Sequence, residues 1–294
     1  MKKKKGLTVT TKQRIAGWAF LTPASLLIFI LSFYPMFQAL LTSFKTGSSA
    51  NMKWAPLFFN YKRMFADKLF MRSVGNTFLY LIIQVPIMLI VAILLAQILN
   101  NKDLKFKGLF RTMVFLPCAT SLVSYALIFK SLFATQGLMN QILQNLGITH
   151  ENINFLGTPI TAKAIIIIAL LWRWTGYNMV FYLAGLQNIE YQVYEAAKID
   201  GANGWQTFWR ITWPLSLPGV ISGITMVFVP SLTTFVISDI LGGGKILLIG
   251  NIIEQLFTQD NDRNAGAGLS IVMMIFIVIS TLITEKYDKE GEVK

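Results

Sequence analysis

Six long apolar segments constrain the fold of this chain more than any other feature. Each is long enough to cross a bilayer, which takes about 20 mostly apolar residues in a helix. They are Ala16–Phe44, Thr77–Leu99, Leu109–Phe133, Ala164–Leu186, Pro214–Ile240 and Ala265–Ile283. Only 14% of the residues are charged, whereas a soluble domain has about 25%. Because a helix satisfies its own backbone polar groups, the sequence predicts an all-α integral membrane protein of six transmembrane helices.

The first apolar segment follows the basic residues at the N-terminus and could be mistaken for a signal peptide. It is longer than the roughly 7–15 apolar residues of a signal peptide, and no small-residue cleavage site follows it. We therefore expect a basic N-terminal region over residues 1–15, a transmembrane domain over 16–283 and a tail over 284–294.

The distribution of Lys and Arg predicts the orientation. The net charge is +12, but these residues lie between apolar segments and not on one face, which argues against a nucleic-acid partner. The inner segments would be 1–15, 100–111, 187–213 and 284–294, and the outer loops 45–76, 134–163 and 240–264. This arrangement places 15 basic residues inside and 9 outside. Since basic residues favour cytoplasmic loops, we expect a multi-pass inner-membrane protein with both termini in the cytoplasm.

Two outer loops carry local signals. Phe65, Leu69, Phe70 and Ser73 fall at helical spacing in the first loop, which predicts a short amphipathic helix at the membrane surface. Gly242–Gly244 in the last loop is typical of a turn.

The fifth apolar segment, Pro214–Ile240, is the most polar of the six. Hydroxyl groups and prolines are tolerated in a spanning helix where it lines a cavity and not lipid. We therefore predict that Ser222, Met226 and Thr233, or an adjacent stripe of the same helix, face a cavity. Asp239, at the outer end, is the only carboxylate within the six predicted segments.

The fourth segment places Arg173, Trp174, Tyr177 and Asn178 at membrane depth. A charge at that depth is costly and is a functional candidate by default. The alternatives for Arg173 are a partner subunit or the carbonyl groups at a helix end, and aromatic side chains at such depth also serve packing.

Residues 190–214, between the fourth and fifth segments, form an unusual connecting loop. The composition predicts a helix from Tyr191 to Asp200, ended by Gly201 at positive φ. Asn203 can cap a second, aromatic-rich helix, and Pro214 would open the next span. Small side chains near the bend allow another protein's backbone to approach, so the loop is a candidate docking element.

The residues of this loop resemble a known family. Glu195-Ala196-Ala197, Asp200-Gly201, Ile211 and Pro214 look like the EAA loop of binding-protein-dependent ABC importer permeases. The resemblance implies a type I importer (MetI-like) permease fold, in which this loop docks a cytoplasmic ABC ATPase subunit. It also implies a second permease subunit, identical or related, and an extracytoplasmic solute-binding protein. The polar residues of the fourth and fifth segments then become candidates for the translocation pathway.

The resemblance leaves two solute classes open. The N-terminal two-thirds, including Tyr182-Leu-Ala-Gly-Leu-Gln187, is similar to oligosaccharide permeases. The C-terminal third, from Phe228 to Asn251, is similar to spermidine/putrescine permeases. Because the fourth segment offers amides and aromatic faces, which suit sugars, we favour a carbohydrate with a polyamine as the alternative.

The sequence also argues against several other functions. Gly242-Gly-Gly244-Lys245 is followed by Ile246 and has no glycine at position 239, so it is not a phosphate-binding P-loop. We therefore expect no enzymatic activity and no cofactor in this chain, with ATP and Mg²⁺ bound by the partner ATPase. His150 has no second ligand at metal spacing, and the single Cys118 is expected to be inert. An ion-coupled secondary transporter, the remaining alternative, would favour intramembrane carboxylates or inverted repeats.

Overall fold

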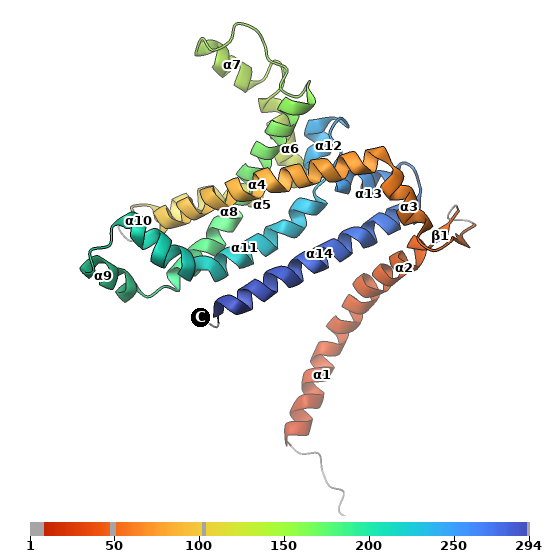
Figure 1. Ribbon diagram of the computed structural model, residues 1–294, viewed down its shortest axis with the longest axis horizontal. Helices are drawn as coiled ribbons and strands as arrows, with labels where there is room; N and C mark the ends of the chain where they lie inside the picture. The colour runs from red at the N-terminus through yellow and green to blue at the C-terminus, as the bar shows by residue number, and fades with distance from the viewer. Residues whose placement is uncertain (1–8, 48–50, 102–103, 293–294) are drawn as a thin grey trace, which may run out of the picture.

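The computed structural model describes residues 9–47, 51–101 and 104–292 (Figure 1). Within this part of the chain the structure is helical apart from one hairpin of β1 (Lys45–Thr46) and β2 (Lys53–Trp54). Five helices are long and apolar enough to cross a membrane, and a bent helix pair makes a sixth span. The predicted six-helix architecture is therefore confirmed. Most of the predicted N-terminal region 1–15 and the last two residues of the tail lie outside the described residues.

The helices follow one another in a simple order. Those of the first half are α1 (Val9–Ile28), a π-helical turn (Phe29–Phe33), α2 (Tyr34–Ser43), α3 (Phe59–Ala66), α4 (Lys68–Asn100), α5 (Lys107–Ala119), α6 (Leu122–Leu132) and α7 (Leu138–Asn145). Those of the second half are α8 (Pro159–Gln187), α9 (Tyr191–Ile199), α10 (Gly204–Thr207), a second π turn (Phe208–Thr212), α11 (Trp213–Thr233), α12 (Val236–Gly242), α13 (Ile249–Thr258) and α14 (Arg263–Glu292).

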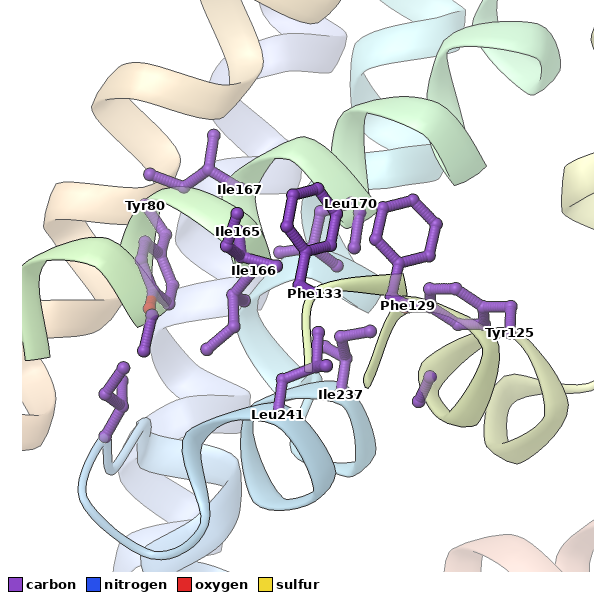
Figure 2. Close-up of a cluster of buried hydrophobic side chains, with 14 of the residues drawn as sticks. Tyr80, Tyr125, Phe129, Phe133, Ile165, Ile166, Ile167, Leu170, Ile237 and Leu241 are labelled. Carbon is purple, nitrogen blue, oxygen red and sulfur yellow. The ribbon is translucent and has the colours of Figure 1, made fainter. Parts of the chain in front are cut away.

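The centre of the molecule is the packing of α8 against α4 and α11. Gly185 of α8 and Gly219 of α11 let the two backbones approach, because a Cβ on Gly185 would lie 3.3 Å from the Cα of Gly219. Toward the start of α8, its isoleucines and Leu170 pack with aromatic residues of α6 and with Ile237 and Leu241 of α12 (Figure 2). Small residues at the crossing are what close helix packing in a membrane requires.

The third span differs from the predicted continuous helix Leu109–Phe133. It breaks between α5 and α6, whose axes are bent by 98°. The backbone of Thr120 is extended, and its hydroxyl donates to the carbonyl of Pro117. Carbonyl groups freed at the end of α5 need other donors in a membrane, and Arg173 of α8 supplies them, as described below.

The fifth span also differs from the predicted Pro214–Ile240. The helix runs without a break from Gly204 to Thr233, so Pro214 lies inside it and does not open it. At its C-terminal end the helix unwinds at Thr234, and the chain resumes as α12. Asn251 of α13 stabilises this break, since its Nδ2 donates to the carbonyl of Phe235 at 3.2 Å.

The two π turns share one cause. Each ends two residues before a proline, Pro35 in the first span and Pro214 in the fifth. Proline has no N–H, and its ring clashes with the carbonyl four residues earlier, here that of Leu31 or Arg210. Each of these carbonyls lies in the middle of its π turn, whose i→i+5 geometry accommodates the proline without ending the helix.

The first span, Gln13–Ser43, extends away from the other helices (Figure 1). None of the residues in its most apolar part is buried. Its C-terminal end is held by α2, which packs on α14, and by Asn60 of α3, whose amide donates to the carbonyls of Ser43 and Lys45 at 2.7 and 2.8 Å.

The predicted amphipathic helix of the first outer loop is wrong as a single element. Asp67 separates α3 from α4, because its side chain accepts from the N–H of Leu69 and starts a new helix. Phe70 and Ser73 therefore belong to the first turns of the second span, where both are buried. The predicted turn at Gly242–Gly244 is found, with Gly243 and Gly244 at φ +55° and +75°.

Candidate functional site

The loop between the fourth and fifth spans is built around a tightly capped helix end. After α9 the N–H of Gly201 donates to the carbonyl of Lys198 at 3.1 Å, and the N–H of Ala202 donates to that of Ala197 at 2.9 Å. These two bonds form a Schellman motif, which needs a residue at positive φ. Gly201 has φ +77° and meets no atom within 4 Å of its Cβ position, so the requirement for glycine is conformational and not steric.

The helix that follows is capped as tightly. The side chain of Asn203 accepts from the N–H of Gln206 at 2.9 Å, and the side chain of Gln206 accepts from the N–H of Asn203 at 3.0 Å. This reciprocal pair is a capping box. Because both helix ends are satisfied, the turn from Asp200 to Asn203 has one defined geometry, as the sequence predicted.

The predicted docking residues differ in accessibility. Glu195, Ala196 and Asp200 are exposed, whereas Ala197 is 4% exposed. Ala197 and Ala202 occupy the positions that make a hydrophobic contact in a Schellman motif. Ala197 therefore belongs to the inside of the turn, and only Ala196 of the small pair is presented outward. Ile211 is half-buried and Pro214 is exposed, both on the helix that enters the fifth span.

A cavity lies between α9 and the C-terminal ends of α4 and α8. These ends are the ones that the sequence predicts to be cytoplasmic. The volume of the cavity is about 870 Å³, and α9 contributes Tyr191, Tyr194 and Lys198 to its wall. The remaining walls come from Asn100 and neighbouring residues at the end of α4, from the end of α8 and from Thr212. The helix α9 is thus separated from the bundle along one face.

Arg173 lies in the interior at the break of the third span. It is 8% exposed, and its guanidinium donates to the carbonyls of Pro117 and Thr120 at 3.3 and 2.8 Å. The guanidinium also lies over the rings of Tyr125 and Trp174, at 4.9 and 5.6 Å from their centroids. Of the alternatives left open by the sequence, the structure places Arg173 on the carbonyls at the C-terminal end of α5. A cation is also favourable there, because that end of a helix carries partial negative charge.

The other polar residues of the fourth span face their neighbours in the bundle. Asn178 is fully buried, and its amide nitrogen donates to the carbonyl of Trp174 at 3.0 Å and contacts the sulfur of Met88 at 3.4 Å. Tyr177 is half-buried and packs on Trp174, with ring centroids 5.8 Å apart. The structure therefore brings Arg173, Trp174, Tyr177 and Asn178 together along α8 as packing residues of this chain.

The polar residues of the fifth span form a different, more accessible face. Ser222, Met226 and Thr233 are exposed along one side of α11. Asp239 is exposed on α12, beyond the break, and is not part of this helix face. A groove of about 240 Å³ runs between α11 and α14, lined by Ile221, Ser222, Thr225, Met226, Thr281, Thr284 and Glu285.

Sequence reasoning missed the contribution of α14 to this groove. Thr281 and Thr284 lie at the end of an apolar span, where a hydroxyl is unremarkable, so nothing in the sequence distinguished them. Three-residue spacing of hydroxyl residues on both helices, Ser222 with Thr225 and Thr281 with Thr284, was the available signal. Within the described residues there is no group of three or more His, Cys, Asp or Glu that could hold a metal ion.

Comparison with known proteins identifies the family. Residues 64–289 match the family described as "Binding-protein-dependent transport system inner membrane component". The lactose transport system permease protein LacF of Rhizobium radiobacter is 45% identical over 207 residues, which cover 70% of this chain and 69% of LacF. The arabinooligosaccharides transport system permease protein AraP of Halalkalibacterium halodurans is 32% identical over 287 residues, covering 95% of this chain and 89% of AraP.

Solved structures agree on the fold. A chain in the crystal structure of a bacterial ABC transporter that imports the acidic polysaccharide alginate superimposes with a TM-score of 0.76 at 23% sequence identity. The superposition covers 95% of this chain and 96% of that chain. The family match and the permease relatives show that this chain belongs to the binding-protein-dependent inner-membrane components and is a transmembrane permease subunit of an ABC importer.

Proposed function

We propose that the turn between α9 and α10 docks an ABC ATPase subunit and transmits its movement to the spans. The observation that carries the proposal is the doubly capped turn, with Gly201 at φ +77° and the exposed residues Glu195, Ala196 and Asp200 beside it. A docking element must hold its shape under load, and two satisfied helix ends supply that stiffness. The helix from Gly204 to Thr233 connects the turn directly to the polar face of α11.

The chain itself carries out no covalent chemistry in this proposal. ATP and Mg²⁺ bind to the partner ATPase subunits, and closure of these subunits moves α9. The cavity between α9 and the ends of α4 and α8 supports such a movement, because few packed side chains oppose it. A second permease subunit, identical or related, completes the membrane channel, and an extracytoplasmic binding protein delivers the solute.

The proposed solute is an oligosaccharide. The two relatives described above are named for lactose and for arabino-oligosaccharides, and the second aligns over 95% of this chain, including the polyamine-like C-terminal third. Titration of the cognate binding protein with lactose, arabino-oligosaccharides and spermidine tests this assignment. Binding of a sugar supports it, and binding of spermidine alone would replace it with the polyamine alternative.

The proposed pathway runs along the exposed face of α11. Ser222, Met226 and Thr233 share this face, and the groove against α14 adds further hydroxyl groups that suit a sugar. Thr233→Trp should reduce transport while subunit assembly and binding-protein affinity stay unchanged. A Thr233→Ser control keeps the hydroxyl and should transport normally.

Both termini lie in the cytoplasm in this proposal, as the distribution of basic residues predicts. Single cysteines introduced in a Cys118-free background test the orientation. A cysteine at Asn203 should react only with reagents that reach the cytoplasm, and one at Gln144 only with reagents outside the cell. The reverse pattern would invert the topology.

Two substitutions test the docking role in the reconstituted transporter. Gly201→Val forces a side chain into positive φ, at a cost of about 1–2 kcal/mol, and Ala196→Trp adds bulk to the presented face of α9. Both variants should insert and assemble, yet solute-stimulated ATP hydrolysis should fall several-fold. Retention of full stimulated activity by both would end the docking proposal.

The chain offers matched controls for both changes. Gly147 also has positive φ, +70°, with nothing within 4 Å of its Cβ position, but it lies in the loop after α7, which projects from the bundle away from α9 (Figure 1). Gly147→Val therefore imposes the same kind of backbone strain away from α9 and should leave stimulated ATP hydrolysis intact. Ala196→Ser is the small-residue control for Ala196→Trp.

A further inference from the structure

Three tryptophans form a ladder on the helix that leads from the α9–α10 turn into the membrane. Trp205, Trp209 and Trp213 follow one another at four-residue spacing from α10 through the π turn to the first residue of α11. Their ring centroids are 5.6 Å apart from Trp205 to Trp209 and 6.1 Å apart from Trp209 to Trp213. We refer to these three residues as the tryptophan ladder.

The π turn helps to align the ladder. In an α-helix, with about 100° per residue, residues four apart drift by about 40° around the axis. A π turn places more residues in each turn and so reduces the drift. As a result, the rings of Trp209 and Trp213 remain neighbours across the turn.

The helix that carries the ladder is aromatic on two sides. Phe208 and Trp213 pack against the buried cluster shared by α4, α8 and α11, and Thr212 is 4% exposed. On the other side Trp205 is 72% and Trp209 48% exposed. Gln206 and Arg210 are also exposed on this segment, so the helix is amphipathic, and the described part of the chain leaves most of Trp205 and about half of Trp209 uncovered. Exposed aromatic rings beside a basic side chain on an amphipathic helix are typical of a membrane surface.

The position of the ladder relative to the membrane follows from the length of α11. With a rise of about 1.5 Å per residue, Trp209 lies about 6 Å and Trp205 about 12 Å before Trp213 along the helix. The headgroup region of each leaflet is roughly 5–8 Å thick. If Trp213 marks the start of the hydrocarbon, Trp209 falls within the headgroup region, and Trp205 lies about 4–7 Å beyond its outer edge, on the water side.

We propose that the tryptophan ladder binds the headgroup layer of the bilayer leaflet that α11 enters, with Trp209 as its main contact. An indole ring has an apolar body and one N–H donor, which is why tryptophan concentrates at membrane surfaces. Arg210 is exposed within the same segment and can contact lipid phosphates. Continuity with a spanning helix is what favours lipid over a protein partner, since α11 itself brings the ladder to this depth.

The consequence of this contact rests on the proposed function. A ladder held in the headgroup layer fixes the depth of the α9–α10 turn, so that movement of the ATPase rotates or tilts α11 and does not merely push the loop into the lipid. The lipid contact itself requires no ATPase. Its test can therefore fail or succeed independently of the docking test above.

The experiment places a fluorescent probe on the ladder. Trp209→Cys, in a Cys118→Ala background, is labelled with nitrobenzoxadiazole after the full transporter is reconstituted into phosphatidylethanolamine and phosphatidylglycerol vesicles. Lipid spin-labelled at the headgroup should quench the probe roughly twofold more than lipid labelled deep in the acyl chain, as expected for the interface. Aqueous iodide should quench it weakly. The matched control is Lys105→Cys, in the exposed loop between α4 and α5 and outside the proposed docking surface, which iodide should quench strongly.

Three results would overturn the proposal. Strong iodide quenching at position 209 in the intact transporter would place the ladder in water. Lipid quenching that appears only after the ATPase subunits are stripped off would assign the surface to the ATPase, and quenching absent until the second permease is removed would assign it to that subunit.

A second measurement uses the native tryptophans and guards against damage by the probe. The double variant W205F/W209F keeps apolar rings but removes two of the seven Trp residues. In vesicles of shallow-brominated lipid, the fraction of tryptophan fluorescence that is quenched should be lower in this variant than in the parent protein. An unchanged or larger quenched fraction would show that Trp205 and Trp209 do not contact the lipid.

Discussion

The first and fourth spans are both membrane helices, yet they relate to the rest of the chain in opposite ways. In the most apolar part of α8, 50% of the residues are buried by the protein, whereas none is buried in the first span. The better buried helix is the less apolar of the two. Apolarity therefore accounts for insertion into the bilayer but not for packing inside it, since lipid chains are as apolar as leucine.

Polar groups and small residues mark the difference. The helix α8 carries Arg173 and Asn178, which donate within the chain, and Gly176, whose Cβ position would overlap the carbonyl of Val114 on α5. The first span has no equivalent until its outer end, where Ser43 and Lys45 accept from Asn60. A span becomes part of the bundle where it offers groups that lipid cannot satisfy.

The largest predicted effect on stability is at Arg173. Arg173→Ala removes two hydrogen bonds from a charged donor, each worth roughly 1.5–3 kcal/mol, and leaves the end of α5 unsatisfied. We expect a larger fall in Tm than for substitution of Asn60 or Leu31, measured in detergent from the reaction of Cys118 with a maleimide dye on heating. Arg173→Lys keeps the charge but loses the planar guanidinium geometry, and it should restore only part of the loss. A Tm equal to that of the parent protein would contradict a stabilising role for the hydrogen bonds from Arg173 to the end of α5.

A smaller and more local effect is predicted at Asn60. Its amide is 3% exposed and donates to two carbonyls at the outer end of the first span. Asn60→Ala should cost about 1–3 kcal/mol, seen as faster hydrogen exchange at Lys45 and in the hairpin. Asn60→Asp has the same shape without the donor and should be as damaging as Asn60→Ala. Equal Tm losses at Asn60 and Arg173 would erase the contrast between the two regions.

The smallest effect is predicted within the first span. Leu31 is 71% exposed, so Leu31→Ala removes no packing contact inside the chain and should leave Tm unchanged. The matched change Leu170→Ala, at a fully buried position of α8, should cost roughly 2–5 kcal/mol. A drop of Tm in Leu31→Ala alone would show that the first span packs on its own chain. Loss of the second permease on purification, at unchanged Tm, would identify what covers it.

Much of the fold could be predicted from the sequence because insertion of a helix into the membrane depends on the summed hydrophobicity of its residues, which can be read from each segment alone. The same holds for the α9–α10 turn, where Gly201 and Asn203 act through local backbone bonds and need no distant partner. Local rules of this kind are readable in one sequence.

The two helix breaks could not be predicted in the same way. The end of α5 depends on Arg173, 53 residues beyond Thr120, and the end of α11 depends on Asn251. Such donors become visible only when the chain is folded. The continuity of the helix through Pro214 could not be predicted either, because a proline normally indicates a helix start. Here the preceding π turn accommodates the proline ring, so the helix continues.

That π turn also sets an angle. A π turn contains one residue more than the α turn it replaces, and one residue corresponds to about 100° of rotation about a helix axis. The direction in which α9 projects is therefore fixed relative to Ser222, Met226 and Thr233 by the number of residues between Phe208 and Thr212, whatever their identity. Chain length at this point works as an angular setting between the α9–α10 turn and the face of α11.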